Sequence, residues 1–182
     1  EICKWVREKL SFGNDTTHYY FWNPEVVLRN ARKEKFLCDG YARLSACVAQ
    51  NFEIPSRVIW LGGHVIPEFY LSDKEKWIMV DPTYGYYLKS GKVVLSTTQI
   101  ISSFEKGKMP KMVSFRNEKD DEPVSSLKEI IPIYTNKFTF VFSGENTEKG
   151  IKHSILHELK FPIGLQYKEK DSPNLEIQGK VM

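Results

Sequence analysis

Several features that would point to a particular class of protein are scarce or missing in this sequence. Three cysteines in 182 residues are too few and too unevenly spaced for a disulfide framework, and no CxxC pair is present that would indicate a structural zinc site. No apolar run reaches the roughly 18 residues that a membrane-spanning helix needs. The formal net charge is only +3 and the lysines are scattered. The sequence therefore predicts no metal site, no membrane span and no nucleic-acid partner.

The sequence also lacks internal repeats, low-complexity segments and a signal-peptide pattern, and it begins with Glu1 rather than Met. From this start we expect a processed or excised form of a longer chain. Such a form is compatible with an extracytoplasmic or secreted bacterial protein, although the sequence does not identify the location. The hydrophobic fraction of 41%, with 13% aromatic residues, is ample for a packed core. The length suits one domain, with or without a small addition.

Three helices are predicted in the first fifty residues. Residues 2–10 carry apolar side chains at a spacing of four, which is typical of an amphipathic helix. In the second, Pro24 stands at the first helical position and Glu25 in the first turn. The third runs from Cys38 to Gln50 and confines its strongly polar residues to one narrow stripe. A helix this apolar must be surrounded by other structure.

The pattern changes to strands after residue 55. Residues 57–63, 64–71 and 76–83 are rich in β-branched and aromatic side chains, and the polar segment between the last two is short enough for a hairpin. Pro67 cannot donate to a strand ladder, so we expect an edge strand or a bulge near it.

The last part of the chain begins with another short helix and then changes composition. Ser96 and Gln99 form a capping-box pattern ahead of an apolar run. Residues 116–123 are charged and predict a linker, and the alternating phenylalanines of residues 137–143 predict a strand, with further strands at 161–167 and 174–181. Helices followed by an antiparallel sheet indicate an α+β fold. We predict a catalytic domain over residues 1–115, with 116–182 as a linker and a β-rich extension, either of the same domain or of a truncated second one.

The residue that points to chemistry is Cys38, at the start of the apolar helix. A helix N-terminus stabilises a thiolate and offers backbone N–H groups to a developing oxyanion. Gly40 and Ala42 would keep the helix start slim and leave room for a substrate. Asp39 suits the helix dipole but opposes a neighbouring thiolate. By itself, a cysteine in this position is more often a small buried residue than a nucleophile.

A cysteine nucleophile needs a base and a group that orients the base, and two later segments offer them. His64 begins one predicted strand, and Asp81 ends the strand that would pair with it. The start of one strand lies beside the end of the next in an antiparallel hairpin, so the two side chains should be neighbours. Each alone is more often structural, but the three in this order favour a Cys–His–Asp arrangement.

The segments LCDGYA, GGHVIPEFYL and WIMVDPTYG resemble, in that order, the signature segments of the transglutaminase-like superfamily, over roughly residues 1–90. The resemblance implies a papain-like core, with N-terminal helices packed on an antiparallel sheet. It also implies Cys38 as nucleophile, His64 as general base and acid, and Asp81 as the residue that orients the imidazole. No metal or organic cofactor is implied.

The sequence departs from the common pattern of the family after the histidine. Many members carry Ala-Trp and a polar residue there, whereas this chain has Val65–Glu68, which affects substrate contacts rather than the triad. A second oxyanion donor in the family is often an upstream Trp or Gln, for which Trp5 and Trp22 are candidates. Tyr84 belongs to a tyrosine cluster that either lines a cleft or packs in the core.

The chemistry that these residues predict is acyl transfer through a thioester on Cys38, with a protein or peptide as substrate. Hydrolysis by a peptidase or amidase is the first choice, because short bacterial-type domains of this family resemble hydrolases more than cross-linkers. The alternatives are a cross-linking transglutaminase, a non-catalytic protein- or glycan-binding module on the same fold, and an amidase acting on glycosylated asparagine. The last of these usually carries paired cysteines for zinc, which this sequence lacks.

Other candidate residues are better explained by packing. Cys47 lies two and a half turns after Cys38 and should face away from the helix start, and Cys3 should pack too, although a disulfide between Cys3 and Cys47 stays open. His153 and His157 have the spacing of a helical metal pair, but they lie among strand patterns. We therefore expect no metal there. The oligomeric state is not indicated.

Overall fold

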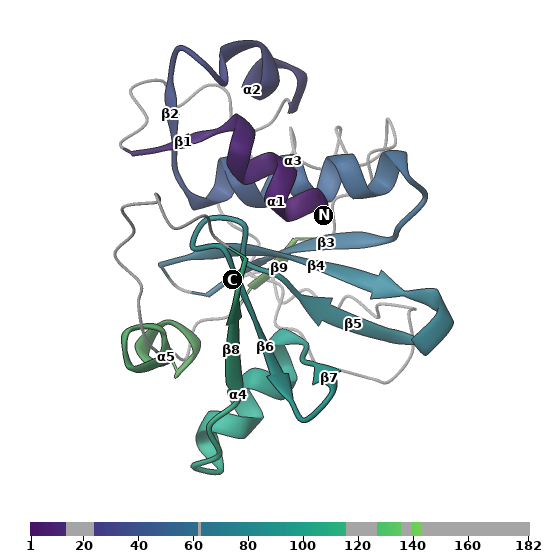
Figure 1. Cartoon of the computed structure of the whole chain (residues 1–182), viewed down its shortest axis with the longest axis vertical. Helices are drawn as coiled ribbons and strands as arrows, with labels where there is room; N and C mark the ends of the chain where they lie inside the picture. Colours follow the sequence, from purple (N-terminus) through teal and green to yellow (C-terminus); the bar gives the residue numbers. More distant parts are fainter. Residues whose placement is uncertain (14–23, 62, 116–126, 136–139, 143–182) are drawn as a thin grey trace, which may run out of the picture.

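The computed structural model describes residues 1–13, 24–61, 63–115, 127–135 and 140–142 of the chain (Figure 1). The elements follow one another as α1 (Ile2–Lys9), β1 (Ser11–Phe12), α2 (Pro24–Asn30), β2 (Lys35–Phe36), α3 (Cys38–Asn51), β3 (Ser56–Trp60), β4 (Val65–Leu71), the 3-10 turn η1 (Ser72–Lys74), β5 (Lys76–Met79), β6 (Tyr86–Ser90), β7 (Val93–Val94), α4 (Thr97–Glu105), β8 (Lys111–Ser114), α5 (Leu127–Thr135) and β9 (Phe140–Phe142). Helices come first and an antiparallel sheet follows, which confirms the predicted α+β class.

The main sheet has four strands in the order β5-β4-β3-β9, and all neighbours are antiparallel. The polar segment before Lys76 forms η1, and Glu75 turns the chain with a φ of 47°. A second sheet of three short strands has the order β7-β6-β8, and β1 pairs with β2 in parallel. The second sheet and β1–β2 were not predicted.

The main sheet lies between two layers (Figure 1). Helix α3 covers one face, where Ala42 and Ala46 pack against Val58 and Val65. Small side chains let a helix approach a sheet closely, which agrees with the predicted burial of α3. The other face is covered by α4, α5 and the second sheet.

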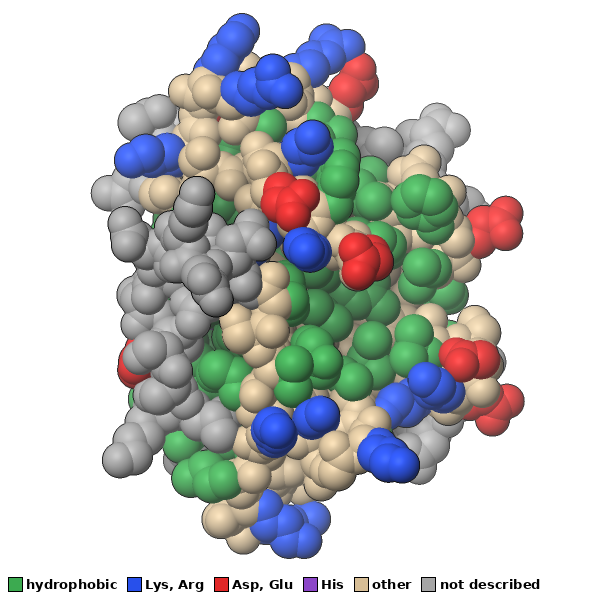
Figure 2. All heavy atoms as spheres, in the orientation of Figure 1, with side chains coloured by type: hydrophobic (Ala, Val, Ile, Leu, Met, Phe, Trp, Pro, Cys, Tyr) green, Lys and Arg blue, Asp and Glu red, His purple; other side chains and the backbone are tan. Residues whose placement is uncertain are grey.

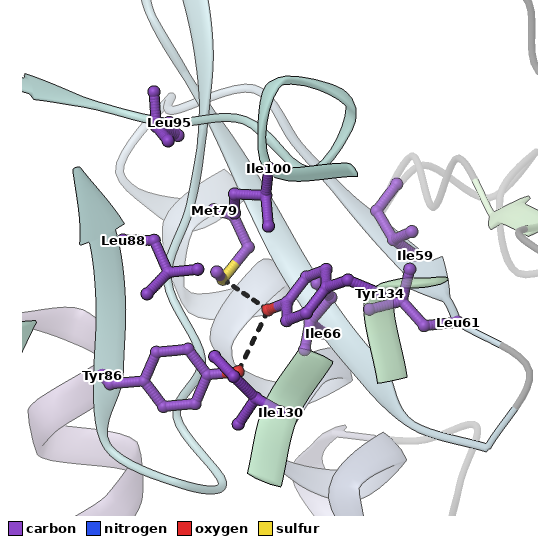
Figure 3. Packing of buried hydrophobic residues seen from close by; sticks show 10 residues of the cluster. All are labelled: Ile59, Leu61, Ile66, Met79, Tyr86, Leu88, Leu95, Ile100, Ile130 and Tyr134. Atoms are coloured by element: carbon purple, nitrogen blue, oxygen red, sulfur yellow. Dashed lines mark hydrogen bonds between the residues drawn. The ribbon is translucent and has the colours of Figure 1, made fainter. Parts of the chain in front are cut away.

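The larger core lies on that second face. Side chains from the main sheet meet side chains from α4, α5 and β6 there (Figure 3): Ile59, Leu61, Ile66, Met79, Tyr86, Leu88, Leu95, Ile100, Ile130 and Tyr134. The predicted capping box is present at the start of α4, where the Ser96 Oγ accepts from the Gln99 N–H at 3.3 Å and the Gln99 Oε1 accepts from the Ser96 N–H at 3.0 Å. The cap fixes the angle at which α4 enters this core.

The expectation of an edge strand or bulge at Pro67 is wrong, because β4 is an interior strand with a continuous register. The ladder between β4 and β5 ends at the pair Glu68–Met79, so the next pair outward would join Pro67 to Val80. The Val80 carbonyl is met instead by the Cys3 thiol of α1, with a sulfur-to-oxygen distance of 3.9 Å. Pro67, which has no N–H to donate, therefore lies at the point where β4 and β5 stop pairing.

Beyond residue 115 the structure describes one helix that was not predicted and one strand, β9, which lies within the strand predicted at residues 137–143. Residues 127–135 form helix α5, which contains Pro132, and β9 pairs with β3 of the main sheet. The predicted linker at 116–123, the predicted strands at 161–167 and 174–181, and both His153 and His157 lie outside the described residues. None of the described helices is long and apolar enough to cross a membrane.

Candidate functional site

Cys38 is the first residue of α3 and is half-buried. The chain enters the helix from β2, and the Phe36 side chain, only 1% exposed, packs against the first turn. A Cβ at Gly40 would lie 3.2 Å from the Phe36 Cβ. Gly40 therefore makes room for Phe36, and the expectation that it leaves space for a substrate is wrong.

His64 and Asp81 lie side by side, as the hairpin argument predicts. The His64 Nε2 is 2.7 Å from the Asp81 Oδ2, and the two residues are 2% and 0% exposed. His64 immediately precedes β4, and Asp81 is the second residue after the end of β5. The antiparallel register of these strands brings the two side chains to the same end of the main sheet.

A tight turn after β5 fixes the Asp81 carboxylate. Its Oδ1 accepts hydrogen bonds from the backbone N–H groups of Thr83 (2.9 Å) and Tyr84 (3.0 Å). Gly85 closes the turn with a φ of 67°, and Asp81 and Tyr86 then exchange two backbone hydrogen bonds of 2.8 and 3.1 Å. An aspartate that accepts from the backbone two residues on is typical of an Asx turn, so Asp81-Pro82 in the sequence was a usable signal. The turn leaves Oδ2 for His64.

The environment of His64 favours its protonated form. Burial lowers the pKa of His64, but the charge and hydrogen bond of Asp81, together with smaller effects of Cys38, raise it from 6.5 to about 10. The raised pKa favours the imidazolium, in which both ring nitrogens are donors. The Nε2 donates to Asp81, which leaves Nδ1 for a second partner.

Cys38 lies close enough to His64 for its side chain to add to the rise in the pKa of the imidazole. The start of α3, the start of β4 and the end of β5 lie at one end of the layers (Figure 1). The structure thus pairs His64 with Asp81, and Cys38 lies near enough to the imidazole to affect its pKa. Cys38 is the most exposed of the three residues, because it is half-buried while His64 and Asp81 are buried.

Tyr84 covers the imidazole. Its ring stacks on the His64 ring at a centroid distance of 4.7 Å and an interplanar angle of 29°. Phe12 contacts Tyr84 in turn at 6.4 Å between centroids, and it also contacts Tyr41 of α3 at 6.3 Å. Figure 2 shows no histidine side chain on the face it displays, in agreement with the burial of His64. Tyr84 thus lies at the predicted site, as a cover for the imidazole.

The two tryptophans proposed as oxyanion donors fare differently. Trp5 is 38% exposed and lies on the side of α1 opposite Cys3, where the Lys9 ammonium stands 5.7 Å from its ring centroid. Its described ring contact is therefore with Lys9 rather than with the three site residues. Trp22 lies outside the described residues.

Helix α1 contributes a contact that the sequence analysis missed. The Arg7 guanidinium donates to the backbone carbonyls of Pro82 (3.4 Å) and Thr83, and so ties α1 to the turn that holds Asp81. Cys3 lies nearby on the same helix, and burial raises the pKa of its thiol to about 12. Cys3, Cys38 and Cys47 are all free thiols. Within the described ranges, no group of three or more His, Cys, Asp or Glu side chains could hold a metal ion.

Comparison with protein families matches residues 1–82 to the family described as the transglutaminase-like superfamily. The match agrees with the resemblance of the three sequence segments, and the matched span contains Cys38, His64 and Asp81. No curated protein and no solved structure matches the chain.

Proposed function

On the premise that residues 1–82 form a domain of the transglutaminase-like superfamily, we propose that this protein is a cysteine-dependent hydrolase of amide bonds in a protein or peptide. The observation that carries the proposal is the buried His64–Asp81 hydrogen bond of 2.7 Å, together with the effect of the Cys38 side chain on the pKa of His64. Such a geometry suits a nucleophile, a base and an orienting group in a row.

In the proposed reaction, His64 holds the proton of the Cys38 thiol, and the sulfur attacks the amide carbonyl carbon. The backbone N–H of Cys38, at the start of α3, is the donor that we assign to the oxyanion, because the Gly40 N–H already bonds to the Leu37 carbonyl (3.1 Å) and to the Asp39 Oδ1 (2.9 Å). His64 then gives its proton to the departing amine, and a thioester remains on Cys38.

In the proposed hydrolysis, water attacks the thioester and completes the catalytic cycle. His64 takes one proton from the water as its oxygen attacks the thioester carbonyl, the carbon–sulfur bond breaks, and the product leaves as a carboxylic acid. Asp81 holds the imidazole through Nε2 throughout, which leaves Nδ1 for the sulfur. A lysine amine in place of water would give an isopeptide cross-link, which is the second candidate.

The test is the rate at which iodoacetamide alkylates Cys38 at pH 7, resolved by mass spectrometry of the peptides. Cys47 is the internal control, because it is a half-buried thiol on the same helix. We expect Cys38 to react at least about tenfold faster than Cys47 because a thiolate–imidazolium pair is the reactive form, and we expect His64→Ala to remove the difference. Equal rates for the two thiols in the unmodified protein would favour the binding-module alternative.

The acyl acceptor is tested with p-nitrophenyl acetate, which acylates a reactive thiol without substrate recognition. Release of acetate from Cys38 at a rate unaffected by added n-butylamine supports hydrolysis. An increase in that rate with amine concentration, in the wild type but not for a small-molecule thioester under the same conditions, supports the cross-linking alternative.

A further inference from the structure

Arg7 of helix α1 reaches the backbone of the turn that carries Asp81. Its side chain is half-buried, and a single guanidinium nitrogen, Nη1, donates to the carbonyls of Pro82 (3.4 Å) and Thr83. Both of these turn residues are buried. A buried carbonyl without a hydrogen-bond partner is costly, so the two bonds from Arg7 matter to the conformation of the turn.

The two carbonyls belong to the peptide groups that hold the Asp81 carboxylate. The Pro82 carbonyl shares its peptide group with the Thr83 N–H, and the Thr83 carbonyl shares the next one with the Tyr84 N–H. These two N–H groups donate to the Asp81 Oδ1 at 2.9 and 3.0 Å. Both peptide groups are trans, and a trans group directs its C=O and its N–H to opposite sides. Each group therefore stands between the guanidinium on one side and the carboxylate on the other.

The charges on the two sides suit the direction of the peptide dipoles. The positive guanidinium of Arg7 lies at the carbonyl oxygens, and the Asp81 carboxylate lies at the N–H groups. Hydrogen bonds that follow one another through a polar group polarise that group and strengthen each other. The guanidinium should therefore fix the orientation of both peptide groups and strengthen the two bonds that hold the carboxylate.

The second of these peptide groups also carries the ring that covers the imidazole. The Tyr84 ring stacks on the His64 ring with the centroids 4.7 Å apart. The N–H of Tyr84 lies in the peptide group whose carbonyl Arg7 binds, so the backbone from which this ring projects is held on both sides. The Asp81 Oδ2 in turn lies 2.7 Å from the His64 Nε2. The carboxylate and the ring that contact the imidazole thus both depend on peptide groups bound by Arg7.

We infer that Arg7 is a positioning residue, which acts on His64 through the two peptide groups and the Asp81 carboxylate. The catalytic meaning of this role rests on the proposed function, in which the imidazole must present Nδ1 to the sulfur of Cys38. Without the guanidinium, the carboxylate would rotate more freely and the imidazole would be held less precisely. Small displacements of a reacting group lower the rate strongly, so helix α1 belongs to the site through this one side chain.

The test measures how fast three protons exchange with water, by nuclear magnetic resonance of the nitrogen-15-labelled protein. The three protons are the amide protons of Thr83 and Tyr84 and the proton on the His64 Nε2, which is assigned by its absence in His64→Ala. Arg7→Met removes the charge and the donors, and it should speed the exchange of all three by about tenfold, because bonds to a charged group are weakened. Arg7→Lys should restore most of the protection, since one nitrogen serves both carbonyls and an ammonium has donors for both.

An internal control separates positioning from a general opening of the turn. The amide protons of Gly85 and Tyr86 lie in the same turn, but they bond to the backbone carbonyl of Asp81, at 3.0 and 3.1 Å, rather than to its carboxylate. Their exchange should change little in Arg7→Met, whereas opening of the whole turn would speed the exchange of all the amides in it. Arg7→Gln keeps donors without the charge, and it serves as the milder variant with a smaller effect in the same direction.

The matched control variant is Lys76→Met. The Lys76 Nζ is another half-buried cation bonded to a backbone carbonyl, that of Val94 at 2.6 Å, and it lies at the other end of β5. Its removal should leave the three protons exchanging as in the unmodified protein. The catalytic consequence is the rate at which p-nitrophenyl acetate acylates Cys38, which Arg7→Met should lower by about tenfold or more and Arg7→Lys should largely restore.

The role of Arg7 is refuted when the three protons of the folded Met and Gln variants exchange as in the unmodified protein. It is also refuted when the amides of Gly85 and Tyr86 speed up as much, since Arg7 would then only keep the turn folded. The two proposals can fail separately. A fast-reacting Cys38 with unmoved protons in Arg7→Met would leave the hydrolase standing without this role. A slow Cys38 in the unmodified protein, with faster exchange in Arg7→Met, would leave the positioning role standing without catalysis.

Discussion

Replacing Asp81 with Asn should change how the stability of the fold depends on pH. The pKa of His64 is raised from 6.5 to about 10 in the folded protein, where burial lowers it and Asp81 more than offsets that effect. A group whose folded pKa is raised stabilises the fold fully below its unfolded pKa, and this contribution is lost as the pH rises through the folded pKa. The window for His64 is therefore about pH 6.5 to about pH 10.

The magnitude follows from the number of protons bound. Within the window the folded chain holds one proton at His64 that the unfolded chain has released, so the free energy of unfolding falls by about 1.4 kcal/mol for each pH unit. In Asp81→Asn the burial effect remains and the carboxylate is gone, so the pKa of His64 should fall below its ordinary value. The fall in stability between pH 7 and 10 that is due to His64 should then vanish.

The assay is urea unfolding at several pH values, followed by tryptophan fluorescence. Asn keeps an oxygen for the backbone N–H groups of Thr83 and Tyr84, so the turn should persist. Cys3 also titrates at high pH, but the charge of Asp81 is the smallest of the effects on its pKa, which burial raises to about 12, so the difference between the two proteins below about pH 9 isolates His64. Asp73→Asn is the matched control, because that side chain is 71% exposed.

The reasoning predicts that Asp81→Asn is most destabilised relative to the wild type near pH 7 and that the gap narrows toward pH 10. If the free energies of unfolding of the two proteins fell in parallel between pH 7 and 10, Asp81 would not be the group that keeps His64 protonated. Asp73→Asn should follow the wild type throughout.

Two further predictions concern stability. Glu68→Gln should lower the free energy of unfolding by about 3–5 kcal/mol, because it leaves the buried Arg57 without its counter-charge. The same change at the exposed Glu25 should alter it by no more than about 0.5 kcal/mol. Urea unfolding measures both, and a similarly small effect at Glu68 would contradict the first prediction. Ser96→Ala should cost about 1 kcal/mol through loss of the α4 cap, and Ser96→Thr should restore most of it if the cap is the cause.

Local patterns were enough to predict the elements that carry the site. The apolar surface of Cys38–Asn51 required a buried helix, and the β-branched and aromatic residues around His64 and before Asp81 predicted paired strands. Antiparallel pairing then placed His64 next to Asp81 without further assumption. These predictions succeeded because each depended on neighbours close in the sequence.

The parts that sequence patterns did not predict depend on distant neighbours. The strands β6, β7 and β8 are two to five residues long, too short for a clear periodicity. The segment of α5 contains Pro132 and several β-branched residues, which disfavour a helix locally, and packing of Ile130 and Tyr134 on the core decides otherwise. Gly40 was misread because the nearness of Phe36 appears only when β2 meets α3.

Pro67 sets the length of the hydrogen-bonded ladder between β4 and β5. An ordinary residue there would offer the Val80 carbonyl another N–H, and the two strands could stay joined one step further toward the site. With proline the strands part at Met79, and the freed backbone of Asp81 folds back onto Tyr86. One proline thus determines where the pairing of β4 and β5 ends and where the turn that carries Asp81 begins.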